Sequence, residues 1–225
     1  MAALNRARPS RVMDKYQIPQ RQGTWSWRDS KWAETLDFLG SFLRRPGTIG
    51  ALAPSSRSLA LTMIQGLELR RANAVVELGA GTGAFTGPIS ERVGKQTVFF
   101  ALEIEDASVQ VLRRRFPRVT VYPDSAERIP DYLARHGKAR ADYIISGLPW
   151  ATLPESVQER IWNAVVSTLA PEGVFVTFSY FHARWLPRGR RFRQRLHQHF
   201  RRVEISPMVW ANLPPAFVYR CSLRM

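Results

Sequence analysis

Three glycines at alternate positions follow a short apolar run, in the segment Glu77-Leu78-Gly79-Ala80-Gly81-Thr82-Gly83. Glycines in such a turn let the backbone bend sharply and approach a ligand closely. Dinucleotide-binding proteins use a similar turn, but here Ala84 stands at the sixth position of their fingerprint. Glu77 would repel a pyrophosphate at this place, whereas it would attract an ammonium group. The turn therefore indicates a ligand that carries an ammonium group.

Two acids follow the next two apolar runs. Glu103 comes about two dozen residues after Gly79, where a carboxylate can accept hydrogen bonds from both hydroxyls of a ribose. Asp124, with Ser125 beside it, can bond the exocyclic amine of an adenine. The alternatives are a helix N-cap for Asp124 or Ser125 and an ordinary acid at the end of a strand for Glu103. Together the acids predict a nucleoside site.

A further segment, Ser146-Gly147-Leu148-Pro149-Trp150, follows the fourth apolar run, and Tyr180 ends the fifth. Open α/β sheets bind ligands at the carboxyl ends of their strands, where these residues are expected. The ring faces of Trp150 and Tyr180 can hold a cation. The alternative for Tyr180 is an aromatic residue of the core at a strand end. We expect the second substrate to bind here.

The elements that must position these residues alternate along the chain. Apolar runs predict strands over 74–78, 97–103, 119–122, 143–146, 174–180, 203–208 and 216–222. Helices are predicted over 58–67, 85–93, 107–116, 126–135, 155–169 and 189–200. Such alternation predicts a parallel sheet covered by helices on both faces, and the last two strands predict an antiparallel edge. The expected fold is a Rossmann-like α/β fold with a seven-stranded, mostly parallel sheet.

Before this domain lies a basic segment, residues 1–45, which ends in a predicted amphipathic helix over 31–45. Trp32, Leu36, Leu39 and Leu43 form an apolar stripe along that helix, and Trp25, Trp27, Arg28 and Arg44 lie near it. Aromatic anchors and cations beside an apolar stripe are typical of a helix that lies in a membrane interface. The alternative is a helix that packs on the sheet or covers the cofactor as a lid.

The composition indicates the class of binding partner and the cellular compartment. The 225 residues carry a net charge of +15, and residues 184–202 hold eight arginines and no acid. Such a surface attracts nucleic acid or an anionic membrane, although either basic stretch can simply be solvated. The single cysteine, Cys221, excludes an intrachain disulfide, which favours a reduced, intracellular setting. We expect no signal peptide, no membrane-spanning helix and no metal site.

The order of glycine turn, acid and acid resembles the class I S-adenosylmethionine-dependent methyltransferases over residues 74–180. The resemblance implies that S-adenosylmethionine is the cofactor. The glycine turn would lie against its methionine part, Glu77 would order that turn, and Glu103 and Asp124 would hold the ribose and the adenine. The cofactor-binding residues that it implies are Glu77, Gly79, Ala80, Gly81, Gly83, Glu103, Ile104, Asp124, Ser125 and Ser146.

Three segments resemble the bacterial phospholipid N-methyltransferases: residues 49–57, Ser146-Gly147-Leu148-Pro149, and 212–219. That family methylates the headgroup amine of phosphatidylethanolamine, in some members as far as phosphatidylcholine. The resemblance implies a membrane-docking segment over 1–45, a methyltransferase domain over 46–225, and a cytoplasmic protein on the inner face of the cell membrane. Its partners would be an anionic membrane surface and an amino-phospholipid. The catalytic residues would be Ser146, Gly147, Leu148, Pro149, Trp150 and Tyr180.

Two alternatives remain open. The segment 146–150 is also similar to the Asn-Leu-Pro-Tyr tetrad of the RNA adenine dimethyltransferases, and the positive charge suits RNA. Ser146 replaces the asparagine of that tetrad, however, and a serine lacks the paired donor and acceptor of an amide. The other alternative is a non-catalytic nucleic-acid-binding module on this fold. Such a module would have little use for the glycine turn and Glu103, and cofactor binding by calorimetry would distinguish the two.

Overall fold

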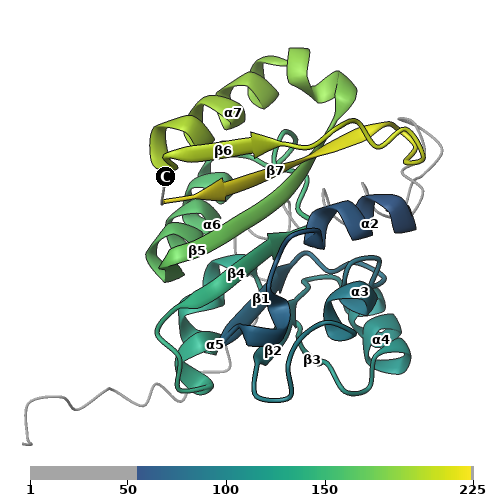
Figure 1. Ribbon diagram of the computed structural model, residues 1–225, viewed down its shortest axis with the longest axis vertical. Helices are drawn as coiled ribbons and strands as arrows, with labels where there is room; N and C mark the ends of the chain where they lie inside the picture. The colour runs from purple at the N-terminus through teal and green to yellow at the C-terminus, as the bar shows by residue number, and fades with distance from the viewer. Residues whose placement is uncertain (1–54, 224–225) are drawn as a thin grey trace, which may run out of the picture. The chain divides into compact units, whose positions relative to one another are not determined.

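The computed structural model describes residues 55–223, which form one seven-stranded sheet between two layers of helices. The order of the strands across the sheet is β3-β2-β1-β4-β5-β7-β6 (Figure 1). Their bounds are β1 Ala74–Leu78, β2 Val98–Leu102, β3 Thr120–Tyr122, β4 Ala141–Ser146, β5 Leu169–Tyr180, β6 Arg202–Ile205 and β7 Ala216–Ser222. Strands β1 to β5 are parallel, whereas β7 is antiparallel to both of its neighbours, β5 and β6. The predicted fold class is confirmed.

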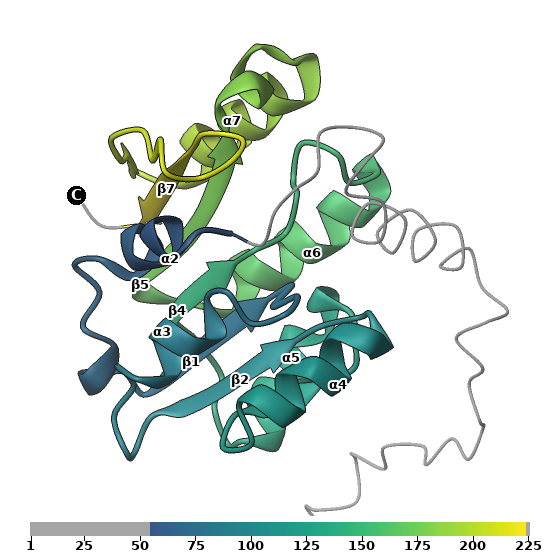
Figure 2. The same ribbon diagram turned by 90° about the vertical axis from the view of Figure 1, so that its right-hand side faces the viewer.

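Within residues 55–223, three α-helices cover each face of the sheet. The helices are α2 Arg57–Ile64, α3 Thr86–Ser90, α4 Asp106–Arg115, α5 Ile129–Arg135, α6 Glu155–Thr168 and α7 Pro187–His199. Figure 1 shows α2, α3 and α4 on one face and α5, α6 and α7 on the other, and Figure 2 is turned toward the first group. Short 3₁₀ helices lie at η2 Leu69–Arg71, η3 Ala126–Arg128 and η4 Phe181–Trp185.

The core explains why the central strands read as continuous apolar runs. All five residues of β1 are buried, because helices cover the strand on both sides. Val75 packs with Leu59 and Ile89 on the α2–α3 side, while Val76 packs with Phe175 and Leu196 on the other side. Burial on both faces leaves no polar alternation in the sequence of such a strand. The sheet therefore forms a rigid platform whose strand ends position the candidate site.

Several element bounds differ from the prediction. The predicted helix over 126–135 divides into η3 and α5, since Ser125 caps the first and Pro130 stands in the first turn of the second. Strand β5 begins at Leu169 rather than at 174, so the predicted helix before it ends one residue earlier. The predicted helix over 31–45 lies outside the described residues. Within residues 55–223, no helix is long and apolar enough to cross a membrane.

Candidate active site

The candidate residues meet at one edge of the sheet. Strands β1, β2 and β4 are adjacent and parallel, and Leu78, the last residue of β1, lies opposite Leu102 in β2 and Ser146 in β4. Ser146 in turn lies opposite Thr177 of β5, three residues before Tyr180. The segments after all four strands therefore leave the sheet on the same side. This arrangement agrees with the predicted placement of the glycine turn, the acids and the Ser146 segment.

The glycine turn has a backbone that favours glycine. Gly79, Gly81 and Gly83 have φ angles of 65°, 54° and 93°, in the region that side chains disfavour. A Cβ placed on Gly81 would meet no atom within 4 Å, so this position faces open space. The Gly83 amide donates to the carbonyl of Ala80 at 2.9 Å and closes the turn. A ligand can therefore approach the backbone at Gly81 closely.

Glu103 holds the glycine turn through hydrogen bonds. Its Oε2 accepts from the Gly81 amide at 2.7 Å, and its Oε1 accepts from the amides of Ile104 and Glu105 at 2.8 and 2.9 Å. Burial raises the pKa of Glu103, whereas these amides act in the opposite direction. Because a carboxylate oxygen has two lone pairs, Oε2 keeps one for a ligand hydroxyl. The predicted contact between Glu103 and a ribose is compatible with this geometry.

Glu77 is the other buried acid, fully enclosed beneath the turn beside Thr86. Neither oxygen of Glu77 nor the Thr86 hydroxyl has a hydrogen-bond partner at normal geometry within residues 55–223. Burial raises the pKa of Glu77 to about 8, an effect that the nearby Thr86 opposes and that the charge of Glu103 increases. Unsatisfied buried polar groups are costly, which makes this carboxyl a place where a cationic ligand would be stabilised.

The third acid is fixed by its neighbours. Asp124 accepts a hydrogen bond from the hydroxyl of Tyr132 at 2.8 Å and one from the amide of Ser125 at 2.7 Å. The Ser125 hydroxyl accepts from the Glu127 amide at 3.5 Å, as the N-cap of η3. The capping alternative thus describes Ser125 in this structure. Asp124 remains half-exposed at the end of β3, where an adenine amine can reach it.

The Ser146 segment packs against the glycine turn. The Gly147 amide donates to the carbonyl of Leu78 at 2.7 Å, and a Cβ on Gly147 would lie 2.6 Å from the carbonyl oxygen of Gly79. Only glycine allows that approach, which explains the additional glycine in the segment. The side chain of Leu148 covers Gly79, and the carbonyl of Pro149 accepts from the amide and the hydroxyl of Thr152.

Trp150 does not fit the predicted role of a ring that stacks on the second substrate. It is 2% exposed, and its ring stacks on Phe192 of α7 at 5.0 Å between centroids. Its indole N–H donates to the hydroxyl of Ser146 at 3.0 Å, and that hydroxyl also accepts from the Leu148 amide at 3.3 Å. Trp150 is therefore a core residue that orients Ser146. An aromatic residue after a strand gives the same sequence signal in both roles.

Tyr180 lies half-buried at the carboxyl end of β5. Its ring packs edge-on against Phe178 at 5.3 Å and stacks on His182 at 5.8 Å. Phe178 in turn contacts Phe85, which follows the glycine turn, at 5.8 Å. Burial raises the pKa of Tyr180 to about 12, so its phenol stays protonated near neutral pH. It can donate a hydrogen bond or present its ring, but it is not a base there.

Sequence reasoning missed a structural role for Asn212. This side chain is buried, and its Oδ1 accepts from the Ser56 amide at 2.8 Å while its Nδ2 donates to the Pro214 carbonyl at 2.8 Å. Ser56 caps α2, so the bond fixes the start of that helix against the β6–β7 loop. Both segments, 49–57 and 212–219, resemble the same family in sequence. That shared resemblance was the signal that could have linked them.

The chemistry of this edge fits S-adenosylmethionine. A buried, unpartnered Glu77 suits an ammonium group, the open Gly81 admits a ligand to the backbone, and Glu103 offers a lone pair to a hydroxyl. Within residues 55–223, no group of three His, Cys, Asp or Glu side chains is placed to hold a metal ion. The carboxylates and the open backbone at Gly81 fit an organic cationic ligand.

Comparisons with known proteins agree with this chemistry. Residues 75–173 match a family described as "Methyltransferase domain". The chain is 32% identical over 187 residues to the ornithine lipid N-methyltransferase of Singulisphaera acidiphila, a match that covers 82% of this chain and 93% of that protein.

Solved structures share the fold. Human methyltransferase-like protein 13, in complex with SAH, is 21% identical with a TM-score of 0.55, and the match covers 75% of this chain and 79% of that one. The TehB-like methyltransferase of Corynebacterium glutamicum is 12% identical with a TM-score of 0.52, over 85% and 99% of the two chains.

Proposed function

We propose that this chain, which belongs to the bacterial phospholipid N-methyltransferase family of class I S-adenosylmethionine-dependent methyltransferases, methylates the headgroup amine of a membrane lipid. The observation that carries the proposal is the 32% identity to a lipid N-methyltransferase across 93% of that protein. Phosphatidylethanolamine is the acceptor that we propose first, with phosphatidylcholine as the product of successive transfers. Ornithine lipid, named in the relative, is the second candidate.

S-adenosylmethionine supplies a methyl group already activated by its sulfonium. The residues proposed to bind it are those at the edge formed by β1, β2, β3 and β4. Glu77 would pair with the ammonium group, Glu103 would accept from the ribose, and Asp124 would accept from the adenine amine. Gly79, Ala80, Gly81 and Gly83 would form the backbone surface against which the methionine part lies, with Ile104, Ser125 and Ser146 around it.

The acceptor amine would approach from the side of β4 and β5. Direct transfer requires that the protein position the nitrogen in line and exclude water. The carbonyls of Ser146 and Gly147 would accept hydrogen bonds from the amine, while Leu148 and Pro149 would shape the entrance. An ammonium headgroup must lose its proton before it attacks. Because Tyr180 stays protonated, water would take that proton, while a carbonyl near Ser146 accepts a hydrogen bond from the nitrogen.

The protein would work at a membrane surface. The segment 1–45 is proposed to dock on the inner face of the cell membrane through its amphipathic stripe, with anionic lipid as partner. The eight arginines of residues 184–202 add to the attraction. RNA is a polyanion too, so charge alone does not distinguish the two partners.

Methyl transfer from labelled cofactor tests the proposal. We expect label in the lipid fraction with detergent-dispersed phosphatidylethanolamine or ornithine lipid, and none in unmodified ribosomal RNA under the same conditions. Transfer to only one of the two lipids would identify the headgroup. Label in RNA and in neither lipid would contradict the proposal.

A further inference from the structure

Apolar side chains lie exposed on two neighbouring segments beyond the carboxyl end of β5. Trp185 is 56% exposed on η4, and Trp210 and Leu213 are 69% and 71% exposed on the β6–β7 loop. Phe181 joins the two segments, because its ring lies 4.5 Å from that of Trp185 and 6.4 Å from that of Trp210. We name the surface formed by Phe181, Trp185, Leu186, Trp210 and Leu213 the aromatic rim.

The loop is held in this position by hydrogen bonds. The Phe181 amide donates to the carbonyl of Pro215 at 2.8 Å, and Asn212 anchors the same loop to Ser56. Exposed apolar residues are common singly, but a fixed, contiguous group of large ones marks an interaction site. The aromatic rim is thus a built surface whose apolar side chains gain from being covered.

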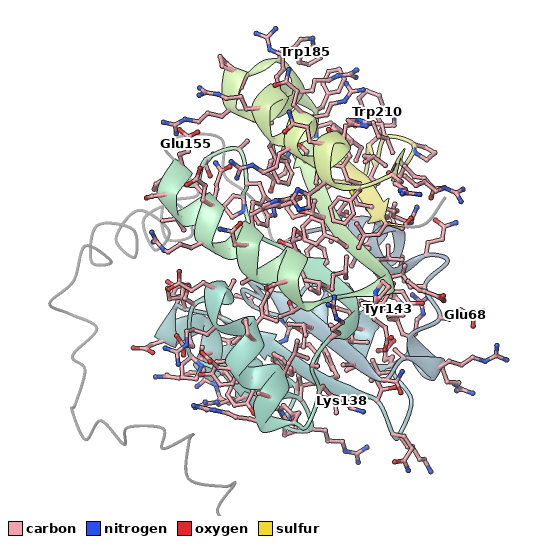
Figure 3. All side chains as sticks on the ribbon, turned by 90° about the vertical axis from the view of Figure 1, so that its left-hand side faces the viewer. Glu68, Lys138, Tyr143, Glu155, Trp185 and Trp210 are labelled. Atoms are coloured by element: carbon pink, nitrogen blue, oxygen red, sulfur yellow. The ribbon has the colours of Figure 1, made fainter. Side chains whose placement is uncertain are left out.

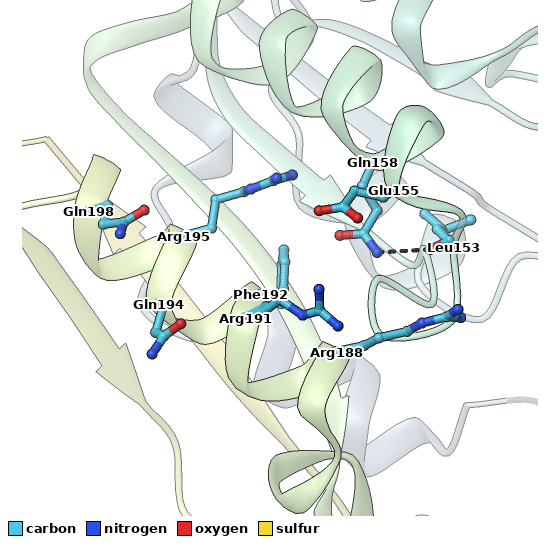
Figure 4. Close-up of a pocket in the computed structure, with 9 residues that line it drawn as sticks. All are labelled: Leu153, Glu155, Gln158, Arg188, Arg191, Phe192, Gln194, Arg195 and Gln198. Atoms are coloured by element: carbon cyan, nitrogen blue, oxygen red, sulfur yellow. Dashed lines mark hydrogen bonds between the residues drawn. The ribbon is translucent and has the colours of Figure 1, made fainter.

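One arginine lies against the aromatic rim, and others follow it in sequence along α7. The Arg184 guanidinium lies 5.8 Å from the ring centre of Phe181 and 5.3 Å from that of Trp185. Helix α7 continues the run with exposed arginines, and Arg195 of this helix lies 4.0 Å from Glu159 of α6. Figure 4 shows Arg188, Arg191 and Arg195 beside a groove between α7 and α6. The charge around the rim therefore suits an anionic partner.

The position of the rim relates it to the candidate active site. Trp185 follows Tyr180 by five residues, so the rim begins where β5 leaves the sheet, at the edge that carries Gly81 and Ser146. Figure 3 shows Trp185 and Trp210 toward one end of the domain and Lys138, which precedes β4, toward the other. A partner that covers the rim would lie beside the entrance for the acceptor.

We propose that the aromatic rim, with Arg184 and the arginines of α7, docks in the interface of an anionic lipid bilayer. Tryptophan and leucine side chains enter the boundary between headgroups and acyl chains, while arginines pair with anionic headgroups. RNA would pair with the arginines too, but it offers no apolar phase to Leu186 and Leu213. The choice of lipid as the partner rests on the proposed function. The aromatic rim would be a second docking element, within the catalytic domain, besides the segment 1–45.

Vesicle cosedimentation with the full chain tests this surface. Against vesicles of phosphatidylcholine and phosphatidylglycerol, we expect Trp185→Ser with Trp210→Ser to weaken binding roughly tenfold or more, because both side chains lose the interface. Trp185→Phe with Trp210→Phe keeps apolar rings and should retain most of the binding. Arg184→Glu should weaken binding, whereas Lys138→Glu makes the same charge change at the other end and should not. Equal binding by the serine double variant and the wild type would overturn the inference.

Fluorescence gives a second measurement that does not depend on the loss of binding. In a chain with Trp25, Trp27 and Trp32 replaced by Phe, the exposed tryptophans are Trp185 and Trp210, since Trp150 and Trp162 are buried. Vesicles with brominated acyl chains should quench this chain. Unquenched emission from vesicle-bound protein would place the rim in water and overturn the inference.

The same variants separate this inference from the proposed function. With detergent-dispersed amino lipid, we expect the serine double variant to transfer methyl groups at close to the wild-type rate, and with bilayers to lose most transfer. If the wild type methylates no lipid in detergent, the proposed function fails, while vesicle binding still tests the rim. If the rim variants lose binding to RNA but not to vesicles, the rim is a nucleic-acid surface and the inference is wrong.

Discussion

At the scale of single residues, Glu77 and Thr86 are the side chains of the site whose polar atoms lack good hydrogen bonds within residues 55–223. Both side chains are buried, and neither makes a hydrogen bond of normal geometry within residues 55–223. A carboxyl whose pKa is about 8 in the folded chain, against a usual 4.5, binds more protons when folded than when unfolded at the pH values between. Its contribution to stability is therefore complete below pH 4.5 and is lost as the pH rises through 8.

The raised pKa of Glu77 predicts how the stability of the ligand-free protein depends on pH. The free energy of unfolding should fall as the pH rises from about 5 to 8, and Glu77→Gln, which stays neutral, should flatten the fall. Burial raises the pKa of Glu103 as well, so part of the pH dependence of stability should remain in the Glu77→Gln variant. Thermal unfolding across this pH range measures it. Identical slopes for Glu77→Gln and the wild type would show that Glu77 is not the titrating group.

Glu103 should affect cofactor binding through two contacts, its hold on the Gly81 amide and the proposed ribose bond. Glu103→Ala is expected to weaken S-adenosylmethionine binding by about 1.5–3 kcal/mol, the cost of charge-assisted hydrogen bonds. Glu105 is a matched control, since its carboxylate bonds the Ser108 hydroxyl. Calorimetry should find Glu105→Ala within about twofold of the wild type. Similar affinities for both variants would remove Glu103 from the cofactor site.

Because Trp150 lies in the core, its replacement should affect the stability of the fold more than the binding of the acceptor. Trp150→Ala is expected to lower the free energy of unfolding by about 3–5 kcal/mol, because it opens a cavity against Phe192 and Phe175. Trp150→Phe keeps most of the packing and loses the bond to Ser146, at about 1 kcal/mol. Its turnover should fall while cofactor affinity stays within about twofold. Unfolding by urea and steady-state kinetics separate the two effects, and a fully stable alanine variant would contradict the core placement.

At the scale of elements, the contact between the start of α2 and the β6–β7 loop depends on one side chain. Asn212→Ala removes the acceptor for the Ser56 amide and the donor to the Pro214 carbonyl, and we expect a loss of about 2–3 kcal/mol in urea unfolding. Asn212→Asp keeps the acceptor alone and should fall between alanine and wild type. An aspartate as costly as alanine would show that the Pro214 bond carries the effect.

The sequence predicted best the bounds of those strands that are buried along most of their length. Strands β1 and β7 have the predicted bounds, because burial on both faces produces an apolar run with clear ends. The placement of Gly81 and Glu103 after adjacent strands also followed, since parallel strands share an edge, but the hydrogen bond between them was not predicted. The burial of Trp150 and the Ser56–Asn212 bond did not, because both depend on packing between elements, the latter across 156 positions. Local pattern carries no information on such contacts.

At the scale of the whole molecule, the net charge of +15 and the predicted stripe of residues 31–45 lead to a prediction about membranes. Leu36→Glu with Leu39→Glu should weaken cosedimentation with anionic vesicles and spare transfer to detergent-dispersed lipid in part. Binding by the wild type should fall with salt, since exposed charges are screened beyond about 10 Å at 0.1 M. An unfolded double variant would show that the stripe is core. Stronger binding to RNA than to vesicles at matched salt would favour the RNA alternative.

The place of β7 has a consequence for synthesis of the chain on the ribosome. Among the strands of residues 55–223 this one comes last in sequence, yet it lies between β5 and β6 and pairs along seven residues of β5. Until residues 216–222 emerge, the edges of both neighbours carry unpaired backbone groups, which invite association with other chains. The sheet can close only after residues 216–222 have left the ribosome. A nascent chain cut short before Ala216 should therefore be a substrate for chaperones and proteases rather than a partly active enzyme.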